Sequence, residues 1–177
     1  GKSTLIKILA GRIPPDSGFA SLGYNVKIGY YDQENQDLHP NNTVIDELWN
    51  AYPTMTETTV RNALALFLFR GDDISKKVSV LSGGEKARLT LARLMLSKMN
   101  LLILDEPTNH LDINSREVLE NALSGFDGTI IAVSHDRYFI NKLATRILDF
   151  GAESEHHLFA FEGGYGEYLD YRRRYLT

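Results

Sequence analysis

The first residues of the chain carry groups that could bind a phosphate. Gly1, Lys2, Ser3 and Thr4 match the last four positions of the phosphate-binding loop G-x-x-x-x-G-K-[ST]. In that loop the lysine reaches the β- and γ-phosphates, the next hydroxyl binds magnesium, and the amino end of the helix directs unpaired N–H groups at the anion. We predict that these four residues bind a nucleotide and that Ser3 also binds Mg²⁺. A basic turn that matches this short pattern by chance is the alternative.

Two adjacent carboxylates follow an apolar run later in the chain. The segment LLILDEP places Asp105 and Glu106 directly after four apolar residues typical of a buried strand. Ligands bind at the carboxyl ends of strands in α/β sheets. Phosphoryl transfer needs one acid that holds magnesium and another that orients the attacking water or accepts its proton. We assign Asp105 to the metal and Glu106 to the water; the alternative is a strand that ends in a solvated acidic turn.

A histidine follows a second apolar run. His135 comes directly after residues 129–134, a short apolar stretch bounded by polar turns. If both runs are strands of one parallel sheet, His135 lies at the same edge as Asp105 and Glu106. An imidazole there could donate a hydrogen bond to a γ-phosphate oxygen. We predict this role for His135, because the other phosphate-binding segments accompany it; the alternative is a residue that only begins a helix.

A glycine pair at the start of a predicted helix could form a second anion site. Ser82 and Glu85 form the S-x-x-E capping pattern, and apolar residues then recur at helical spacing as far as residue 96. Gly83 and Gly84 carry no side chains where the helix dipole is most positive, so a phosphate could approach the backbone closely. An ordinary capped helix is the alternative, and the segment has the features of one.

The elements that must position these residues alternate between strand and helix. Residues 101–105 and 129–134 read as strands of a parallel sheet covered on both faces, with 115–123 as the helix that connects them. This βαβ order is typical of an α/β nucleotide-binding fold. The other predicted elements are a helix within 1–11, a strand at 25–31, a helical subdomain at about 42–98, a strand at 156–161 and a helix at 165–175.

Length and composition indicate one domain and exclude several classes of protein. The 177 residues are 43% hydrophobic and 24% charged, which is ordinary for one folded domain with a substantial core. The net charge of −4 does not suggest a generally basic surface that coats nucleic acid. The absence of cysteine excludes disulfides and thiolate chemistry. Since the longest apolar run is 63–69, we expect no membrane span.

With these segments together, the chain resembles an ATP-binding cassette (ABC) domain. LSGGEKARL resembles the family signature, LLILDEP its Walker B strand, NHLD at 109–112 its D-loop and SHD at 134–136 its switch-histidine segment. The resemblance implies a P-loop NTPase fold with a mostly parallel sheet and a helical signature subdomain. It also implies that ATP and Mg²⁺ are the cofactors.

The resemblance further implies how each nucleotide site is completed. In this family the signature residues close over ATP held by a second cassette, so Ser82, Gly83 and Gly84 would act in trans, together with Asp112 of the D-loop. Gln33, in the segment YYDQ, would be the Q-loop residue that senses magnesium and the attacking water. The implied partner is a second cassette, in the same chain or in a dimer.

Within the family the chain looks like an F-type cassette. DEPTNHLD, joined to VSHDRYF, resembles this group, and the tail FEGGYGEYLDY resembles its F-x-G-N-Y-S-E-Y ending, with Gly164 and Gly166 in place of Asn and Ser. Only 49 positions separate Gln33 from Ser82, too few for the helical arm of an F-type first cassette. We therefore expect a second cassette. Because the chain begins inside the phosphate-binding loop, we also expect the upstream strands and the first part of that loop to be missing from it.

The F-type resemblance implies a function. Members of this group have two fused cassettes and no membrane domain, and many act on ribosomes, so we expect a cytoplasmic, Mg²⁺-dependent ATPase that contacts the ribosome, rRNA or tRNA in translation or antibiotic resistance. The alternatives are the motor domain of an ABC transporter, a genome-maintenance ATPase, and a fragment that acts only as a non-catalytic interaction module. The tyrosines and arginines of residues 165–175 could touch RNA, but a docked helix with a solvated basic end explains them as well.

Overall fold

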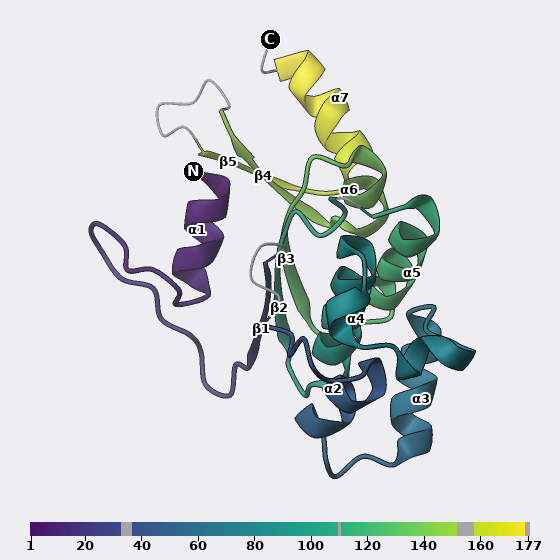
Figure 1. Ribbon diagram of the computed structural model, residues 1–177. Helices are drawn as coiled ribbons and strands as arrows, with labels where there is room; N and C mark the ends of the chain where they lie inside the picture. The colour runs from purple at the N-terminus through teal and green to yellow at the C-terminus, as the bar shows by residue number, and fades with distance from the viewer. Residues whose placement is uncertain (33–36, 110, 152–157, 176–177) are drawn as a thin grey trace.

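A three-stranded parallel sheet lies at the centre of the computed structural model, which describes residues 1–32, 37–109, 111–151 and 158–175 (Figure 1). The strands are β1 (Ile28–Asp32), β2 (Leu101–Asp105) and β3 (Thr129–Val133), in the order β1-β2-β3. The helices are α1 (Lys2–Leu9), α2 (Val44–Ala51), α3 (Glu57–Leu66), α4 (Gly83–Leu96), α5 (Ile113–Ser124), α6 (Arg137–Leu143) and α7 (Tyr165–Tyr175). The first helix lies on one side of the sheet, and most of the others lie on the opposite side (Figure 1).

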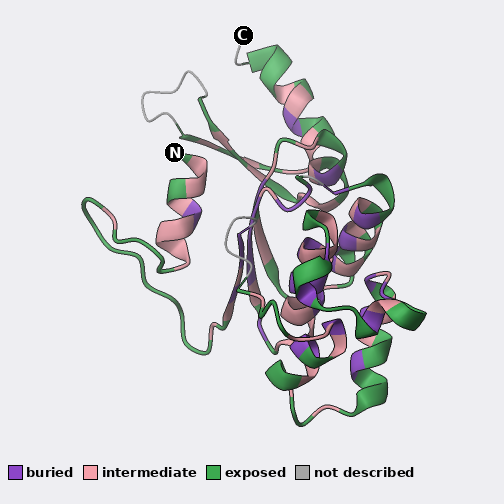
Figure 2. Cartoon of the chain, in the orientation of Figure 1, coloured by how far each residue is buried: buried purple, intermediate pink, exposed green. Residues whose placement is uncertain are grey.

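Alternation of side chains along the strands gives the sheet two apolar faces. Leu102 and Leu104 of β2 belong to the larger core, together with Leu89 and Leu91 of α4. Ile103, between the two β2 leucines, belongs instead to a smaller cluster beneath α1. This explains why all of β2 reads as a continuous apolar run, since a central strand is buried on both faces. Figure 2 shows β1 and β2 as mostly buried, with helices on both sides, whereas β3 is less covered than its apolar run predicted.

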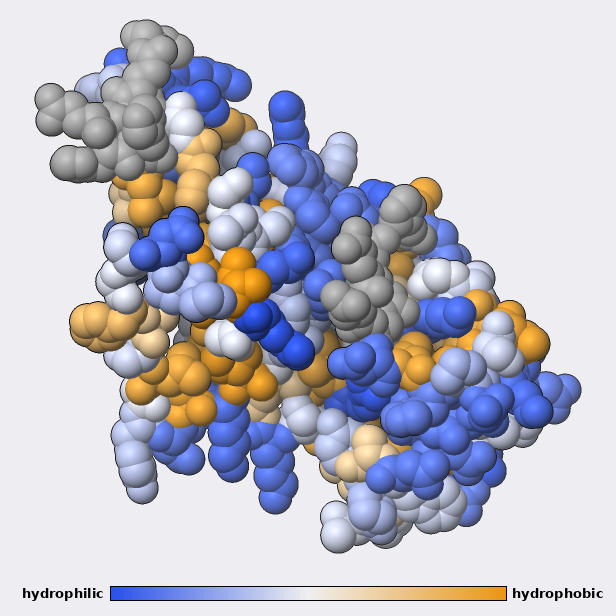
Figure 3. Space-filling view, turned by 60° about the vertical axis from the view of Figure 1, so that its left-hand side comes forward, coloured by the Kyte–Doolittle hydropathy of each residue, from blue (hydrophilic) through white to orange (hydrophobic). Residues whose placement is uncertain are grey.

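The helix α1 is held by few apolar contacts. Ile6 is its one buried residue, and it packs with Ile103 and Val133 of the sheet. The chain then runs without regular secondary structure as far as Lys27, and this stretch exposes Phe19 and Leu22. Figure 3, with the α1 side turned forward, shows several hydrophobic residues on the surface there.

The section between β1 and β2 is helical. Thr43, Thr56 and Ser82 each accept a backbone hydrogen bond as the N-cap of α2, α3 and α4. Two short 3₁₀ helices, Gly71–Ser75 and Val78–Val80, connect α3 to α4. Glu47 of α2 is almost fully buried, where its carboxylate accepts hydrogen bonds from Asn42 (2.8 Å) and from Arg93 of α4 (2.9 Å). This buried ion pair fixes α2 against α4.

The carboxyl-terminal part forms an antiparallel hairpin and a helix. The strands β4 (Arg146–Phe150) and β5 (Leu158–Glu162) pair with each other and are separate from the central sheet. Phe159 stacks on Tyr171 of α7, and the hydroxyl of Tyr168 donates a hydrogen bond to Asp149. The aromatic side chains of α7 are therefore used partly to hold the helix on this hairpin.

The structure corrects some predicted boundaries. The strand predicted at 25–31 begins only at Ile28, because Asn25 has a positive φ of 59° and belongs to a turn. The predicted strand at 156–161 is Leu158–Glu162 in the described part of the chain, and its partner β4 was not predicted. None of the helices in the described ranges is long and apolar enough to cross a membrane.

Candidate active site

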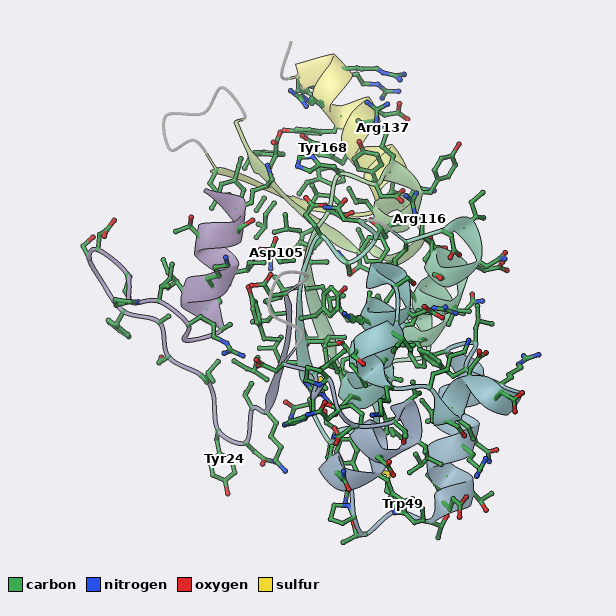
Figure 4. The ribbon with its side chains drawn as sticks, in the orientation of Figure 1. Tyr24, Trp49, Asp105, Arg116, Arg137 and Tyr168 are labelled. Carbon is green, nitrogen blue, oxygen red and sulfur yellow. The ribbon has the colours of Figure 1, made fainter. Side chains whose placement is uncertain are left out.

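The amino end of α1 meets the carboxyl end of β2. The Ser3 hydroxyl donates a hydrogen bond of 3.0 Å to Asp105 Oδ1, across 102 residues of sequence. Asp105 is 9% exposed and lies at the end of β2, beside α1 (Figure 4). The structure therefore brings together the two predicted oxygen ligands of the metal.

The residue after Asp105 turns sharply away from the strand. Glu106 has a φ of 47°, in the left-handed region that side chains other than glycine rarely adopt. Its backbone N–H still donates to the Val133 carbonyl (2.9 Å), which ties this turn to β3. Strained backbone of this kind costs about 1–3 kcal/mol and recurs at functional sites. Here it places the Glu106 side chain at the end of the neighbouring strand.

Glu106 and His135 are in direct contact. The backbone N–H of His135 donates to Glu106 Oε2 (3.2 Å), and its Nε2 lies 3.4 Å from Glu106 Oε1. The glutamate side chain is 19% exposed and the imidazole 77% exposed, so the imidazole is accessible to a ligand while the acid is largely covered. The structure thus brings together the two groups predicted to act on the attacking water and the γ-phosphate.

The predicted phosphate-binding residues form the first turn of α1. Gly1 is the N-cap and provides no side-chain hydrogen bond, so the first N–H groups of the helix have no side-chain cap. Lys2 is half-buried and makes no ion pair with any described residue, and Thr4 is exposed. An uncapped helix start beside a lysine can accept an anion.

The oxygen donors fit a magnesium site of the kind that a bound nucleotide would complete. No group of three or more His, Cys, Asp or Glu side chains in the described ranges could hold a metal ion. Mg²⁺ usually takes one or two carboxylates and completes its octahedron with substrate phosphates and waters. Ser3 and Asp105 fit that pattern. Gln33, the third predicted ligand, lies outside the described residues.

The glycine pair lies at the start of α4, on the other side of the sheet. Ser82 and Glu85 form the predicted capping box, with hydrogen bonds of 2.8 Å from Ser82 N and 3.3 Å to Ser82 Oγ. The bond from the Ser82 backbone lowers the pKa of Glu85. A Cβ atom on Gly83 would meet nothing within 4 Å, so the backbone there is open. Because α4 and α1 cover opposite faces, Ser82, Gly83 and Gly84 are not gathered with Lys2 and Ser3.

Asp112 has a local role that sequence reasoning missed. It is the N-cap of α5 and accepts a 2.8 Å hydrogen bond from the Ser115 backbone. That hydrogen bond lowers the pKa of Asp112. An aspartate directly before a segment with helical periodicity is a typical N-cap, and this signal could have revealed the role.

Asp32, which was not predicted as a site residue, lies beside Asp105. It is the last residue of β1 and pairs in register with Asp105. Burial, together with the charges of Asp32 and Asp105, raises the pKa of Tyr30 to about 12. A strand that ends in an aspartate next to another such strand is the signal that could have identified Asp32.

Comparisons with known proteins show which family the chain resembles. The family described as "ABC transporter" matches residues 1–109. "Putative ATP-binding protein YdiF" of Bacillus subtilis (strain 168) is 54% identical over 176 residues, which are 99% of this chain and 27% of that protein. "Energy-dependent translational throttle protein EttA" of Escherichia coli (strain K12) is 42% identical over 99% of this chain and 32% of its own length.

A plant relative supports the F-type resemblance. "ABC transporter F family member 5" of Arabidopsis thaliana is 41% identical over 96% of this chain and 24% of its own length. The resemblance to F-type cassettes is thereby confirmed. This chain spans about a quarter to a third of the length of these three relatives.

Solved structures confirm the α/β fold. A dimeric ATP-binding cassette in a post-hydrolysis state with ADP and Pi has a TM-score of 0.68 at 22% identity, over 84% of this chain and 75% of that one. A structure described as "RNase-L Inhibitor" has a TM-score of 0.74 at 24% identity, over 98% of this chain and 35% of that one.

Proposed function

The chain belongs to the ABC transporter family, and from that premise we propose that its cassette binds ATP with Mg²⁺ and hydrolyses the bond to the γ-phosphate. One observation carries the proposal. The Ser3–Asp105 hydrogen bond and the Glu106–His135 pair lie at the carboxyl ends of adjacent parallel strands. A hydroxyl and a carboxylate for the metal thus lie beside an acid and an imidazole for the reaction.

Each group has a task that its position supports. Lys2 and the first N–H groups of α1 would bind the β- and γ-phosphates, and Ser3 and Asp105 would hold Mg²⁺, with Gln33 as a further ligand. When bound, Mg²⁺ would neutralise negative charge on the phosphates. Glu106, held by the His135 backbone, would orient the attacking water and accept its proton. The exposed His135 imidazole would donate to a γ-phosphate oxygen.

A second cassette would complete the enclosure of each nucleotide. We propose that Ser82, Gly83, Gly84 and the D-loop residue Asp112 face ATP held by the partner. The open backbone at Gly83 and the position of α4 opposite α1 support this arrangement. A solved structure similar to this chain is a dimer of cassettes with ADP and Pi.

The relatives suggest where this activity is used. We propose a cytoplasmic factor that acts on the ribosome or its tRNA, because a relative 42% identical is named as a translational throttle protein. Co-sedimentation of the ATP-bound protein with ribosomes would test this part of the proposal, and an equal amount of sedimented protein with and without ribosomes would contradict it.

The proposed catalytic role of Glu106 is tested by Glu106→Gln in the intact protein. The amide keeps the size of the side chain but cannot accept the proton, so ATP binding should persist while steady-state hydrolysis falls about a hundredfold or more. Glu117→Gln, at an exposed position of α5, makes the same chemical change away from the site and should leave turnover unchanged. Wild-type turnover by Glu106→Gln would exclude the role.

A further inference from the structure

Two aspartates lie side by side where β1 and β2 end. The strands pair in parallel, with Asp32 opposite Asp105. On both strands, alternate residues face α1: Ile28 and Tyr30 of β1, like Ile103 of β2, pack in the cluster around Ile6. Asp32 and Asp105 continue the same alternation, so both carboxylates face α1.

Both carboxylates lie in a buried environment. Asp32 is 8% exposed and Asp105 is 9% exposed. Two carboxylates that are close together and withdrawn from water repel each other, and a cation between or beside them relieves that repulsion. The Ser3 hydroxyl on Asp105 shows that the amino end of α1 adjoins this pair.

A buried hydroxyl completes the surroundings. The Tyr30 hydroxyl is buried and has no hydrogen-bond partner in the described part of the chain. Tyr30 precedes Asp32 by two positions and faces the same side of the sheet. It therefore retains a donor for a group bound next to Asp32.

We propose that Asp32 is a second carboxylate of the magnesium site, which binds waters of the Mg²⁺ hydration shell while Asp105 and Ser3 lie closer to the ion. Mg²⁺ gives up its waters reluctantly, so outer carboxylates that accept hydrogen bonds from those waters orient and strengthen such sites. Asp32 is thus a positioning residue for the metal. The inference rests on the proposed function, because it needs Mg²⁺ with ATP at Asp105.

The test compares metal-dependent and metal-free nucleotide binding in the intact protein. Mn²⁺, used as a paramagnetic probe for Mg²⁺, is titrated with a non-hydrolysable ATP analogue present, and bound Mn²⁺ is measured by electron paramagnetic resonance. Asp32→Asn should weaken Mn²⁺ binding at least tenfold, the usual cost of losing an outer partner of a metal site. Asp32→Glu keeps the charge and should recover part of this loss, whereas Asp127→Asn, in an exposed turn before β3, should match the wild type.

Binding of the analogue in EDTA separates a metal role from a structural one. Asp32→Asn removes a negative charge near the phosphates, so metal-free binding should stay equal or become tighter. Equal weakening with and without metal would overturn the proposal in favour of a structural role, and unchanged Mn²⁺ affinity would overturn it outright. If the wild type showed no metal-dependent binding, the proposed function itself would fail together with this inference.

Discussion

At the scale of single residues, the site depends on one unusual backbone conformation. The positive φ of Glu106 ends β2 and turns the acid toward β3, where the His135 backbone holds it. Glycine would adopt this conformation without strain, yet a glycine has no carboxylate to orient water. The sequence keeps the strained residue at the position where its side chain is needed for the proposed reaction.

The backbone strain at Glu106 predicts that two inactive variants will differ in stability. Glu106→Gly and Glu106→Ala both remove the carboxylate and should both abolish hydrolysis. The glycine variant should nevertheless be more stable than the alanine variant, by about 1 kcal/mol, because only alanine places a Cβ in the left-handed region. Urea unfolding of the two variants measures the difference. A more stable alanine variant would show that the backbone at Glu106 is unstrained in solution.

At the scale of elements, helix caps position several of the proposed site residues. Ser82 is the N-cap of α4 and Asp112 is the N-cap of α5, so each contributes to the stability of its helix besides its proposed role toward a nucleotide. Loss of activity in variants at these positions has two possible causes, and measurement of stability separates them.

The cap at Asp112 predicts a pH-dependent contribution to stability. Asp112→Ala should lower the free energy of unfolding at pH 7 by about 1 kcal/mol, while Asp112→Asn, which can still cap, should lower it by less. The hydrogen bond from the Ser115 backbone lowers the pKa of Asp112 in the folded state from its ordinary value of 3.8. The ionised carboxylate therefore stabilises the fold fully above pH 3.8. This stabilisation is lost as the pH falls through the lowered pKa of the folded state.

Chemical unfolding at pH 7 and at pH 3 checks this prediction. The stability advantage of the wild type over Asp112→Asn should shrink at the lower pH, because only the aspartate becomes protonated. An advantage that grew as the pH fell would contradict the hydrogen bond from Ser115 as its source.

The elements were predictable where a local pattern determined them. The apolar runs of β2 and β3 and the capping box of α4 gave clear signals, and the structure places these elements as expected. The strand β4 was missed because it begins with Arg146, Asp149 interrupts its apolar residues, and its partner lies beyond a connecting segment. The juxtaposition of Asp32 with Asp105 depends on the register between two strands that are far apart in sequence, which no local pattern specifies.

At the scale of the whole molecule, the sheet separates the two proposed nucleotide-binding surfaces. The phosphate-binding turn lies on α1 and the glycine pair begins α4, on the opposite face. A single cassette with this arrangement would present one surface to its own ATP and the other to the ATP of a partner. Local sequence motifs could therefore predict two anion sites, because each site has its own motif. Only the family resemblance implied that the two sites bind different nucleotides.

The proposed function requires the amino end of α1 to bind the triphosphate, and Lys2→Ala tests this binding most directly. Lys7, on the same helix and also half-buried, provides the matched control Lys7→Ala. Titration of the intact protein with a fluorescent ATP analogue and Mg²⁺ should show affinity at this site about 10- to 100-fold weaker for Lys2→Ala, the cost of losing a charged hydrogen bond to phosphate, and unchanged for Lys7→Ala. Equal affinities for the two variants would contradict binding of the triphosphate by Lys2 at the amino end of α1.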